Sequence, residues 1–482
     1  MKKLLLIGAV VLLPLSAVFA QGFGFDSAFP EAEPPAGGEN GVRVGGSVSG
    51  GLTFFVDDFD APGSAALGDI ADAKLNFSAS GSRAEGFINL LLRPRLSTPA
   101  EILSIDEAYV RAFYGPLTVE GGVRKLAWGR ADSFGPLDVI NPLDYTDLSV
   151  LSDPLAVKIA RPLVRAVFDT GNFTRLEAVF VPWFQGTQFA ADGRWAPLEI
   201  TALPARMMSD FAALVPAGSL PSLPPVTPGD IDLNPERLKT LAYFQAGLRF
   251  TASIASNDFG LQYYTGVLNR PAVTVRYAKE LNDAIKAGNT TAVGSIVGSI
   301  TAVTNPGDLV AVAYNRYHHI GVDYGRVLLG FNIRAEFAAN ITSDLSGDEG
   351  GVYNPALLWS AGFDHDLFAG INLNLQAAES IILFHGGIDP NRAIDTQAGS
   401  RVTATRLTAI LSRKFFREEL ELKVTGLWGI EDGDVYLIPA LVWTRGDAAL
   451  ELSGGVFAGN RDGELGQYRD NGFIKTTLTW SF

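Results

Sequence analysis

Oppositely charged side chains recur an even number of positions apart along several segments of this chain. In an extended strand, residues two or four positions apart lie on the same sheet face. Such a face can neutralise its own charges, or it can line an aqueous passage that admits hydrated solutes, and the two roles are compatible. The candidate residues, expected to face the lumen of such a passage, are Arg83, Glu85, Arg93, Glu107, Arg111, Glu120, Arg124, Arg175, Glu177, Arg334 and Glu336.

Catalytic chemistry finds little support in the same sequence. The chain has four histidines. The adjacent His318 and His319 would point to opposite faces of a strand, so they are poorly placed to bind one metal ion together. The nucleophile motif Gly-x-Ser-x-Gly is absent, as are the Walker loop and the dinucleotide fingerprint. We therefore expect no enzyme activity, no metal site and no cofactor.

The charged residues stand in segments whose apolar and polar side chains alternate. From Val42 to Val56 the even positions are mainly apolar, whereas the odd positions are polar apart from Phe55. A period of two places these sets on opposite faces of a β-strand. Strands of roughly ten residues with this pattern are typical of a transmembrane barrel with a wet interior. A soluble sandwich would show the same period with its apolar face inward. Comparable alternation occupies residues 71–80, 83–93, 327–340, 371–377 and 419–428.

The N-terminus favours an exported protein. Lys2 and Lys3 precede an apolar run over residues 4–15, and Val18-Phe19-Ala20 is typical of a signal-peptide cleavage site. A run of about 12 apolar residues is too short for a membrane-spanning helix, which needs about 20. We predict a signal peptide over residues 1–20, a periplasmic lead-in over residues 21–40 and a barrel over residues 41–482.

The C-terminal segment ends on an aromatic residue. Leu478, Trp480 and Phe482 share one strand face with Ile474. This arrangement resembles the C-terminal signature by which outer-membrane barrels are recognised for insertion. The resemblance implies a barrel-closing strand and a location in the bacterial outer membrane. It also implies outer-membrane lipid and the barrel-assembly machinery as partners, and the aromatic pair suits the girdle at a membrane boundary.

Strand number can be bounded from the same alternation. Segments with this pattern begin near residues 42, 67, 83, 102, 116, 161, 173, 239, 258, 308, 326, 355, 369, 402, 417, 433, 447 and 471. Some could be hairpins within loops, and bacterial barrels have even strand numbers. We therefore predict an all-β, antiparallel up-and-down barrel of about 16 strands, with 14 to 18 possible. A barrel of that size encloses an aqueous lumen unless loops fill it.

Three segments interrupt the alternation. Residues 129–160 are rich in turns, residues 185–238 are rich in proline, and residues 278–306 have helical spacing that is broken near Gly288-Asn289. Long connections in such barrels are usually extracellular loops, and this is what we expect of all three. The alternative is that one of them folds inward and narrows the lumen.

One region also carries a family resemblance. It contains Asp106-Glu107-Ala108-Tyr109-Val110, then Trp128-Gly129, then Asn141-Pro142-Leu143-Asp144. Residues 102–185 thereby resemble a poorly characterised, porin-like family of bacterial outer-membrane β-barrels. Trp128 at a strand end fits an interfacial girdle, and Gly129 would let the backbone turn out of the sheet. Asn141-Pro142 is a turn dipeptide, for which a structural role competes with one in gating or solute contact.

Overall charge restricts the partners. The formal net charge is −14 and the chain has no cysteine. Nucleic-acid binding requires a basic footprint, so we do not expect it. A chain without cysteine is suited to passage through an oxidising periplasm. The surplus of acidic residues favours cations among the solutes that could pass.

Together these patterns predict a porin-like channel for passive diffusion of small hydrophilic solutes. One alternative is a transporter of hydrophobic compounds that resembles the fatty-acid transporters, although residues 21–40 are short for a plug. Another is a structural or adhesive surface barrel that acts through its loops. The solute and the oligomeric state stay open.

Overall fold

The computed structural model describes residues 41–56, 67–93, 103–132, 135–151, 153–215, 225–233 and 236–482. The predicted signal peptide and the lead-in over residues 21–40 lie outside the described residues.

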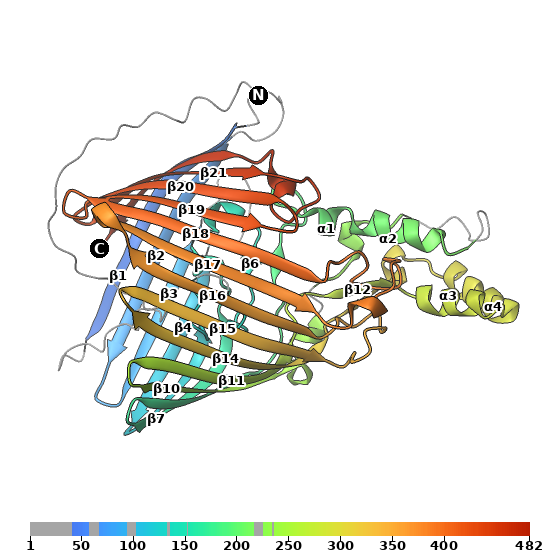
Figure 1. The fold of residues 1–482 in the computed structure, drawn as a ribbon, viewed down its shortest axis with the longest axis horizontal. Helices are drawn as coiled ribbons and strands as arrows, with labels where there is room; N and C mark the ends of the chain where they lie inside the picture. Colours follow the sequence, from blue (N-terminus) through green and yellow to red (C-terminus); the bar gives the residue numbers. More distant parts are fainter. Residues whose placement is uncertain are drawn as a thin grey trace.

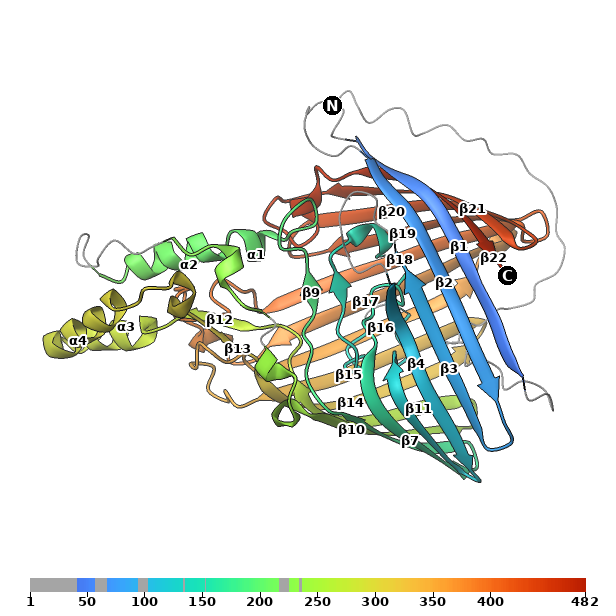
Figure 2. The same cartoon turned by 180° about the vertical axis from the view of Figure 1, so that it is seen from behind.

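The described residues form one 18-stranded antiparallel sheet that closes on itself (Figure 1). Each barrel strand pairs with the next barrel strand along the chain, and β22 returns to pair with β1, as Figure 2 shows. The strands are β1 (Val42–Phe55), β2 (Leu67–Ser80), β3 (Ala84–Leu92), β4 (Leu103–Tyr114), β5 (Leu117–Arg124), β7 (Arg161–Gly171), β8 (Thr174–Val181), β10 (Gln245–Ile254), β11 (Asn257–Val267), β14 (Arg316–Leu328), β15 (Phe331–Thr342), β16 (Ala356–Asp366), β17 (Ile371–Ile382), β18 (Thr403–Phe415), β19 (Leu420–Gly429), β20 (Asp434–Arg445), β21 (Ala448–Ala458) and β22 (Phe473–Ser481).

The strand count corrects the sequence prediction of about 16 strands, and 18 is the upper end of the range we gave. Most alternating segments correspond to barrel strands, although the segments near residues 239 and 326 begin several residues before β10 and β15. The segment near residue 308 begins at β13 (Val310–Ala313), which lies outside the ring, and the start of β14 was not identified. The alternating run over residues 327–340 crosses the turn at Leu329-Gly330 between β14 and β15. The error was to assign some segments to loop hairpins. Each of them is hydrogen-bonded along both edges within the ring, which local alternation alone does not reveal.

The apolar side chains of the barrel face outward. In β14, Ile320 and Val322 are exposed, whereas the flanking His319 and Asp323 are buried. A soluble protein would show the reverse, because its apolar surface is removed from water on folding. The soluble sandwich is therefore excluded, and the apolar face lies on the outside, as it does in transmembrane barrels. Among the described residues, no helix is long and apolar enough to cross a membrane.

The closing strand is β22. Trp480 pairs with Val48 of β1 on one side and with Ala448 of β21 on the other. Leu478, Trp480 and Phe482 are exposed on the outer face, and the rings of Trp480 and Phe482 lie 5.1 Å apart. The backbone N–H of Phe482 donates to Gly46 O at 3.0 Å, so the last residue also takes part in closure.

The two rims of the barrel differ. At one rim, which we call the short-turn rim, eight connections of two to four residues join consecutive strands, and β1 begins and β22 ends there. The other connections lie at the opposite rim, which we call the loop rim, and all but the four residues between β19 and β20 have ten residues or more. Figure 1 shows helices projecting beyond the loop rim. They are α1 (Leu198–Thr201), α2 (Leu203–Ala212), α3 (Ala278–Lys286) and α4 (Thr290–Thr301).

The helical prediction for residues 278–306 is confirmed. Gly288 has a φ of 66°, which ends α3, and the Asn289 side chain accepts a hydrogen bond from the Ala292 N–H at 3.0 Å, which caps α4. The short strands β12 (Ala272–Val275) and β13 (Val310–Ala313) pair beneath these helices. Side chains of β12, β13, α2, α3 and α4 form an apolar core separate from the barrel wall.

The connection between β5 and β7, residues 125–160, does not remain at the loop rim. Its described residues contact strand residues on the inner face of the barrel, from β8 to β22, as the hydrogen bonds and packing below show. We call it the inward segment. It contains β6 (Asp144–Tyr145), which pairs in parallel with β9 (Gln188–Phe189) from the next long loop. The expectation that residues 129–160 form an ordinary extracellular loop was wrong, and the alternative of an inward fold is what the structure shows.

Candidate functional site

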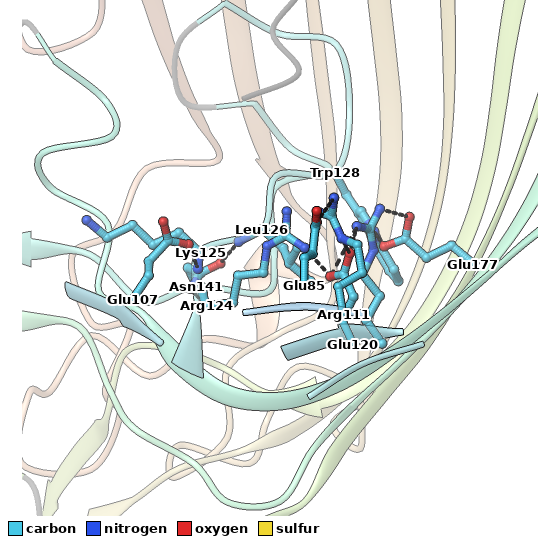
Figure 3. A network of polar contacts seen from close by, with 11 residues as sticks. Glu85, Glu107, Arg111, Glu120, Arg124, Lys125, Leu126, Trp128, Asn141 and Glu177 are labelled. Atoms are coloured by element: carbon cyan, nitrogen blue, oxygen red, sulfur yellow. Dashed lines mark hydrogen bonds and ion pairs between the residues drawn. The ribbon is translucent and has the colours of Figure 1, made fainter. Parts of the chain in front are cut away.

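A network of buried charges lies on the inner face of β3, β4, β5, β7 and β8 (Figure 3). Glu120 is at its centre and is 1% exposed. Its carboxylate accepts from Arg111 Nε at 2.7 Å, from Arg165 Nη1 at 3.3 Å and from Arg124. Arg111 also pairs with Glu85 at 2.9 Å. Because burial of an unpaired charge is costly, these cross-strand pairs make the wall possible.

Trp128 joins the inward segment to this network. Its indole N–H donates to Glu177 Oε1 at 2.8 Å, and Glu177 also accepts from Arg165 at 2.8 Å. The indole is 4% exposed and packs edge-on against Tyr264 at 6.2 Å. The prediction that Trp128 belongs to an interfacial girdle was therefore wrong. Gly247 makes room for the ring, because a Cβ at residue 247 would lie 2.6 Å from the Trp128 side chain.

The residues that carried the family resemblance hold the start of the inward segment. Asp106 pairs with Lys125 Nζ at 2.7 Å, and Glu107 accepts from the Lys125 N–H at 2.9 Å. The Tyr109 ring lies beneath the Arg124 guanidinium, 4.5 Å from its centre. This is a cation–π contact.

Asn141 closes the same loop. Its Oδ1 accepts from the Leu126 N–H at 2.8 Å, and its Nδ2 donates to Ile159 O at 2.8 Å and Arg124 O at 3.2 Å. The side chain therefore satisfies backbone groups at both ends of the inward segment, which is the structural role expected of the Asn141-Pro142 dipeptide.

Farther along, the segment is held by Glu336 of β15. The Glu336 carboxylate accepts from the backbone N–H groups of Ala131 at 2.8 Å, Leu137 at 3.3 Å and Arg130. A Cβ at Gly135 would lie 2.6 Å from Glu336 Oε2, so the glycine lets the chain approach the carboxylate. Three donors converging on one carboxylate form an anion-binding concavity of backbone amides.

Ion pairs on β14–β17 fix the same stretch. Arg130 Nε contacts Asp323 at 2.7 Å, and Asp323 also accepts from Arg249 at 2.6 Å. Asp132 pairs with Arg334, and its second oxygen accepts from Asn374 at 2.7 Å. Burial raises the pKa of the Asp132 carboxyl above its ordinary value, while Arg334 and Asn374 oppose the rise. These strands lie across the ring from β5, so the segment spans the barrel interior.

The later part of the segment is held by apolar packing. Leu148, Leu151 and Val157 pack with Trp195 against the inner face of β19–β22. The wall contributes Leu427, Tyr436, Ile438, Phe457 and Phe473. The Tyr436 hydroxyl donates to Leu148 O at 3.0 Å, so this buried polar group is satisfied.

The eleven candidate residues fall into two groups. Most of them stand within the buried network or beside the inward segment, and these are Glu85, Glu107, Arg111, Glu120, Arg124, Glu177, Arg334 and Glu336. The others lie at strand ends: Arg83 is exposed in a turn, Arg93 is 3.8 Å from Asp72, and Arg175 pairs with Asp169 at 2.9 Å on the surface.

The same-strand pairing that we expected holds for Glu120 with Arg124. Arg111, Arg334 and Glu177 take partners on neighbouring strands or the inward segment instead. The alternating pattern would have revealed Arg165, Arg249 and Asp323 as polar-face residues. Arg130 and Asp132 had no such signal, because their segment has no period of two.

The histidines do not gather into a site. His319 is buried, with Nε2 at 3.0 Å from Gln262 and Nδ1 at 2.8 Å from Asn340, whereas His318 contacts Tyr263 on the outer face. Within the part of the chain that the structure describes, no three His, Cys, Asp or Glu side chains are placed to hold a metal ion.

No sequence-family model matches this chain, and no curated protein matches it. Solved structures with a similar course of the chain include three outer-membrane channels. OmpF of Salmonella typhi in complex with daunomycin is 8% identical, covering 92% of this chain and 98% of that one, with a TM-score of 0.41. The outer-membrane channel DcaP of Acinetobacter baumannii is 10% identical, covering 92% and 97%, with a TM-score of 0.41. A mutant of the Rh. blastica porin is 10% identical, covering 92% and 100%, with a TM-score of 0.38. At these TM-scores, the assignment of a closed barrel rests on the strand pairing of this chain itself.

Proposed function

We propose that this protein is an outer-membrane, porin-like channel for passive diffusion of small hydrophilic solutes, narrowed by the inward segment. One observation carries the proposal. A closed barrel with an apolar exterior has a charged inner wall, and a segment anchored on both sides crosses its interior. Solutes would then pass beside a mixed-charge constriction, where fields of both signs favour hydrated, polar molecules.

The inner wall favours this function over transport of hydrophobic compounds. Its apolar part, around Leu427, Tyr436 and Phe457, is covered by the inward segment and is buried. The remaining inner face carries the charged residues of β4–β8 and β14–β17. A polar path therefore fits the structure better than an apolar binding pocket.

The associated expectations are proposals too. We propose export with cleavage after Ala20, which N-terminal sequencing of the mature protein would test. We also propose that the segment from Ile474 to Phe482 is read by the barrel-assembly machinery and that outer-membrane lipid surrounds the barrel. The candidate charged residues are proposed to build the wall of this path, and Glu120 lies beneath the surface of that wall, since it is 1% exposed.

Conductance across a planar bilayer tests the channel. We expect the purified barrel to insert and to pass ions in discrete steps. Glu336→Ala should raise the step size or its noise, because the backbone donors of Ala131 and Leu137 lose their acceptor. Glu421→Ala is the matched control. It removes one carboxylate from β19, and in the described part of the chain Glu421 makes no hydrogen bond or ion pair with the inward segment. A barrel that inserts and passes neither ions nor small solutes would refute the proposal.

A further inference from the structure

The short-turn rim displays large apolar side chains. Among the described residues, the four most exposed large apolar side chains all lie in its turns: Leu329 at 88%, Phe173 at 85%, Phe368 at 83% and Phe416 at 76%. Turns that face water usually hold Gly, Asn, Asp or Ser. Four large apolar tips at one rim therefore require a separate explanation.

The backbone of these turns strengthens the point. Phe173, Leu329 and Phe416 have φ values of 59°, 53° and 51°, and Ala369 beside Phe368 has 60°. The two-residue turns that hold Phe173 and Leu329 need such left-handed conformations, which Asn, Asp and Gly adopt most readily. The four-residue turns that hold Phe368 and Phe416 contain the same left-handed conformation. A residue with a Cβ loses roughly 1 kcal/mol there. Large apolar residues thus occupy positions where local geometry favours other residues, which points to a contact outside the chain.

The apolar tips occupy one arc of the rim. They belong to the turns β7–β8, β14–β15, β16–β17 and β18–β19. The turns on the other arc, next to the closure of β22 on β1, are polar. They consist of residues 81–83 (Gly-Ser-Arg) between β2 and β3, and of residues 446–447 (Gly-Asp) between β20 and β21. Two further turns have no large apolar residue: Gly115-Pro116 between β4 and β5 separates the arcs, and Ala255-Ser256 between β10 and β11 lies within the apolar arc. The rim is therefore amphipathic around its circumference.

The apolar arc continues the outer surface of the barrel. Val327, two residues before Leu329, is exposed. Phe331, two residues after Leu329, stacks on the His365 ring at 3.9 Å. Arg413 lies over Phe415 at 4.6 Å, directly before Phe416. Aromatic rings and arginines at the edge of an apolar belt are the composition of a lipid–water interface.

We propose that the apolar arc, defined by Phe173, Leu329, Phe368 and Phe416, is immersed in the interfacial layer of the membrane and takes phospholipid head groups and the adjoining acyl chains as its ligand. The polar turns at residues 81–83 and 446–447 stand in water. The inference rests on the proposed membrane-spanning barrel. Continuity with the outer apolar surface favours lipid over a water-soluble protein as the occupant.

Single-cysteine labelling tests this placement, and the chain has no native cysteine to interfere. Phe173→Cys, Leu329→Cys, Phe368→Cys and Phe416→Cys would each carry a small fluorophore in phospholipid vesicles prepared with iodide on both sides of the bilayer. Ser82→Cys and Asp447→Cys are the matched controls on the polar arc. All six positions are exposed turn or turn-flanking residues, so labelling leaves the barrel core untouched.

We expect quenching by a nitroxide placed near the lipid head group at the four apolar positions, and severalfold weaker iodide quenching there than at Ser82 and Asp447. Equal iodide quenching at all six positions would overturn the inference and would favour a water-soluble partner for the arc. Leu261→Cys on the outer face of β11 separates the two proposals. If a lipid-borne nitroxide quenches the Leu261 label but iodide quenches the labels at the apolar tips as strongly as those at Ser82 and Asp447, the barrel spans the bilayer and only the interfacial placement fails. If no lipid-borne nitroxide quenches the Leu261 label, the proposal that the barrel spans the membrane is itself refuted.

Discussion

Two parts of the inward segment are held against the barrel by different kinds of interaction. Its first part, from Lys125 to Leu137, meets the barrel through ion pairs and hydrogen bonds to β4–β8 and β14–β17. Its later part, around Leu148 and Leu151, meets β19–β22 through apolar packing. Charged contacts are directional and fix position and register, whereas apolar contacts are non-directional and tolerate small displacements. The charged contacts therefore fix the position of the segment on one wall, and the burial of apolar side chains retains it on the other.

The charged wall should be the more sensitive to loss of a single group. We expect Glu120→Ala to lower the free energy of unfolding by about 3–5 kcal/mol, since it leaves buried guanidiniums, among them Arg165, without their shared carboxylate. Urea unfolding of the barrel in lipid vesicles would measure the change. Asp169→Ala is the matched control, because its pair with Arg175 is exposed and should contribute less than about 1 kcal/mol. A similar decrease in the free energy of unfolding in both variants would show that the buried network contributes no more to stability than an exposed ion pair.

The apolar end should respond to lost volume. Leu148→Ala removes buried contacts with Tyr436 and should cost about 2–4 kcal/mol. Because the far end of the segment is loosened, we also expect noisier single-channel conductance. Leu155→Ala in the same segment is the control, since Leu155 is exposed. A Leu148→Ala channel as quiet and as stable as the Leu155→Ala channel would mean that the charged end alone retains the segment.

The contact between Trp128 of the inward segment and Gly247 of β10 depends on close packing rather than on charge. Gly247→Ala places a Cβ against the Trp128 ring and should cost about 1–3 kcal/mol through overpacking. Gly121→Ala on β5 is the control, because a Cβ there meets no atom within 4 Å. Equal stability of the two variants would indicate that Trp128 can move without loss, and the indole bond to Glu177 would then be a weak anchor.

Much of the barrel was predictable because its pattern is local. The period of two identified most of the barrel strands and the polar face that carries Glu120 and Arg124, but it did not locate the start of β14. The number of strands was underestimated only because some segments were assigned to loops. The contacts of Arg334 and Glu336 were not predictable in the same way, since their partners lie in the inward segment, which has no alternation.

The sequence by itself therefore determined most of the strands, which of their faces is polar, and that the segment with Leu478 and Trp480 closes the barrel. The tertiary structure decided which charges meet, that residues 125–160 turn into the barrel, and that Trp128 is buried rather than interfacial. The reason is physical. Alternation depends on neighbours along one strand, whereas Asp132 meets Arg334 only after closure of the ring brings the inward segment against β15.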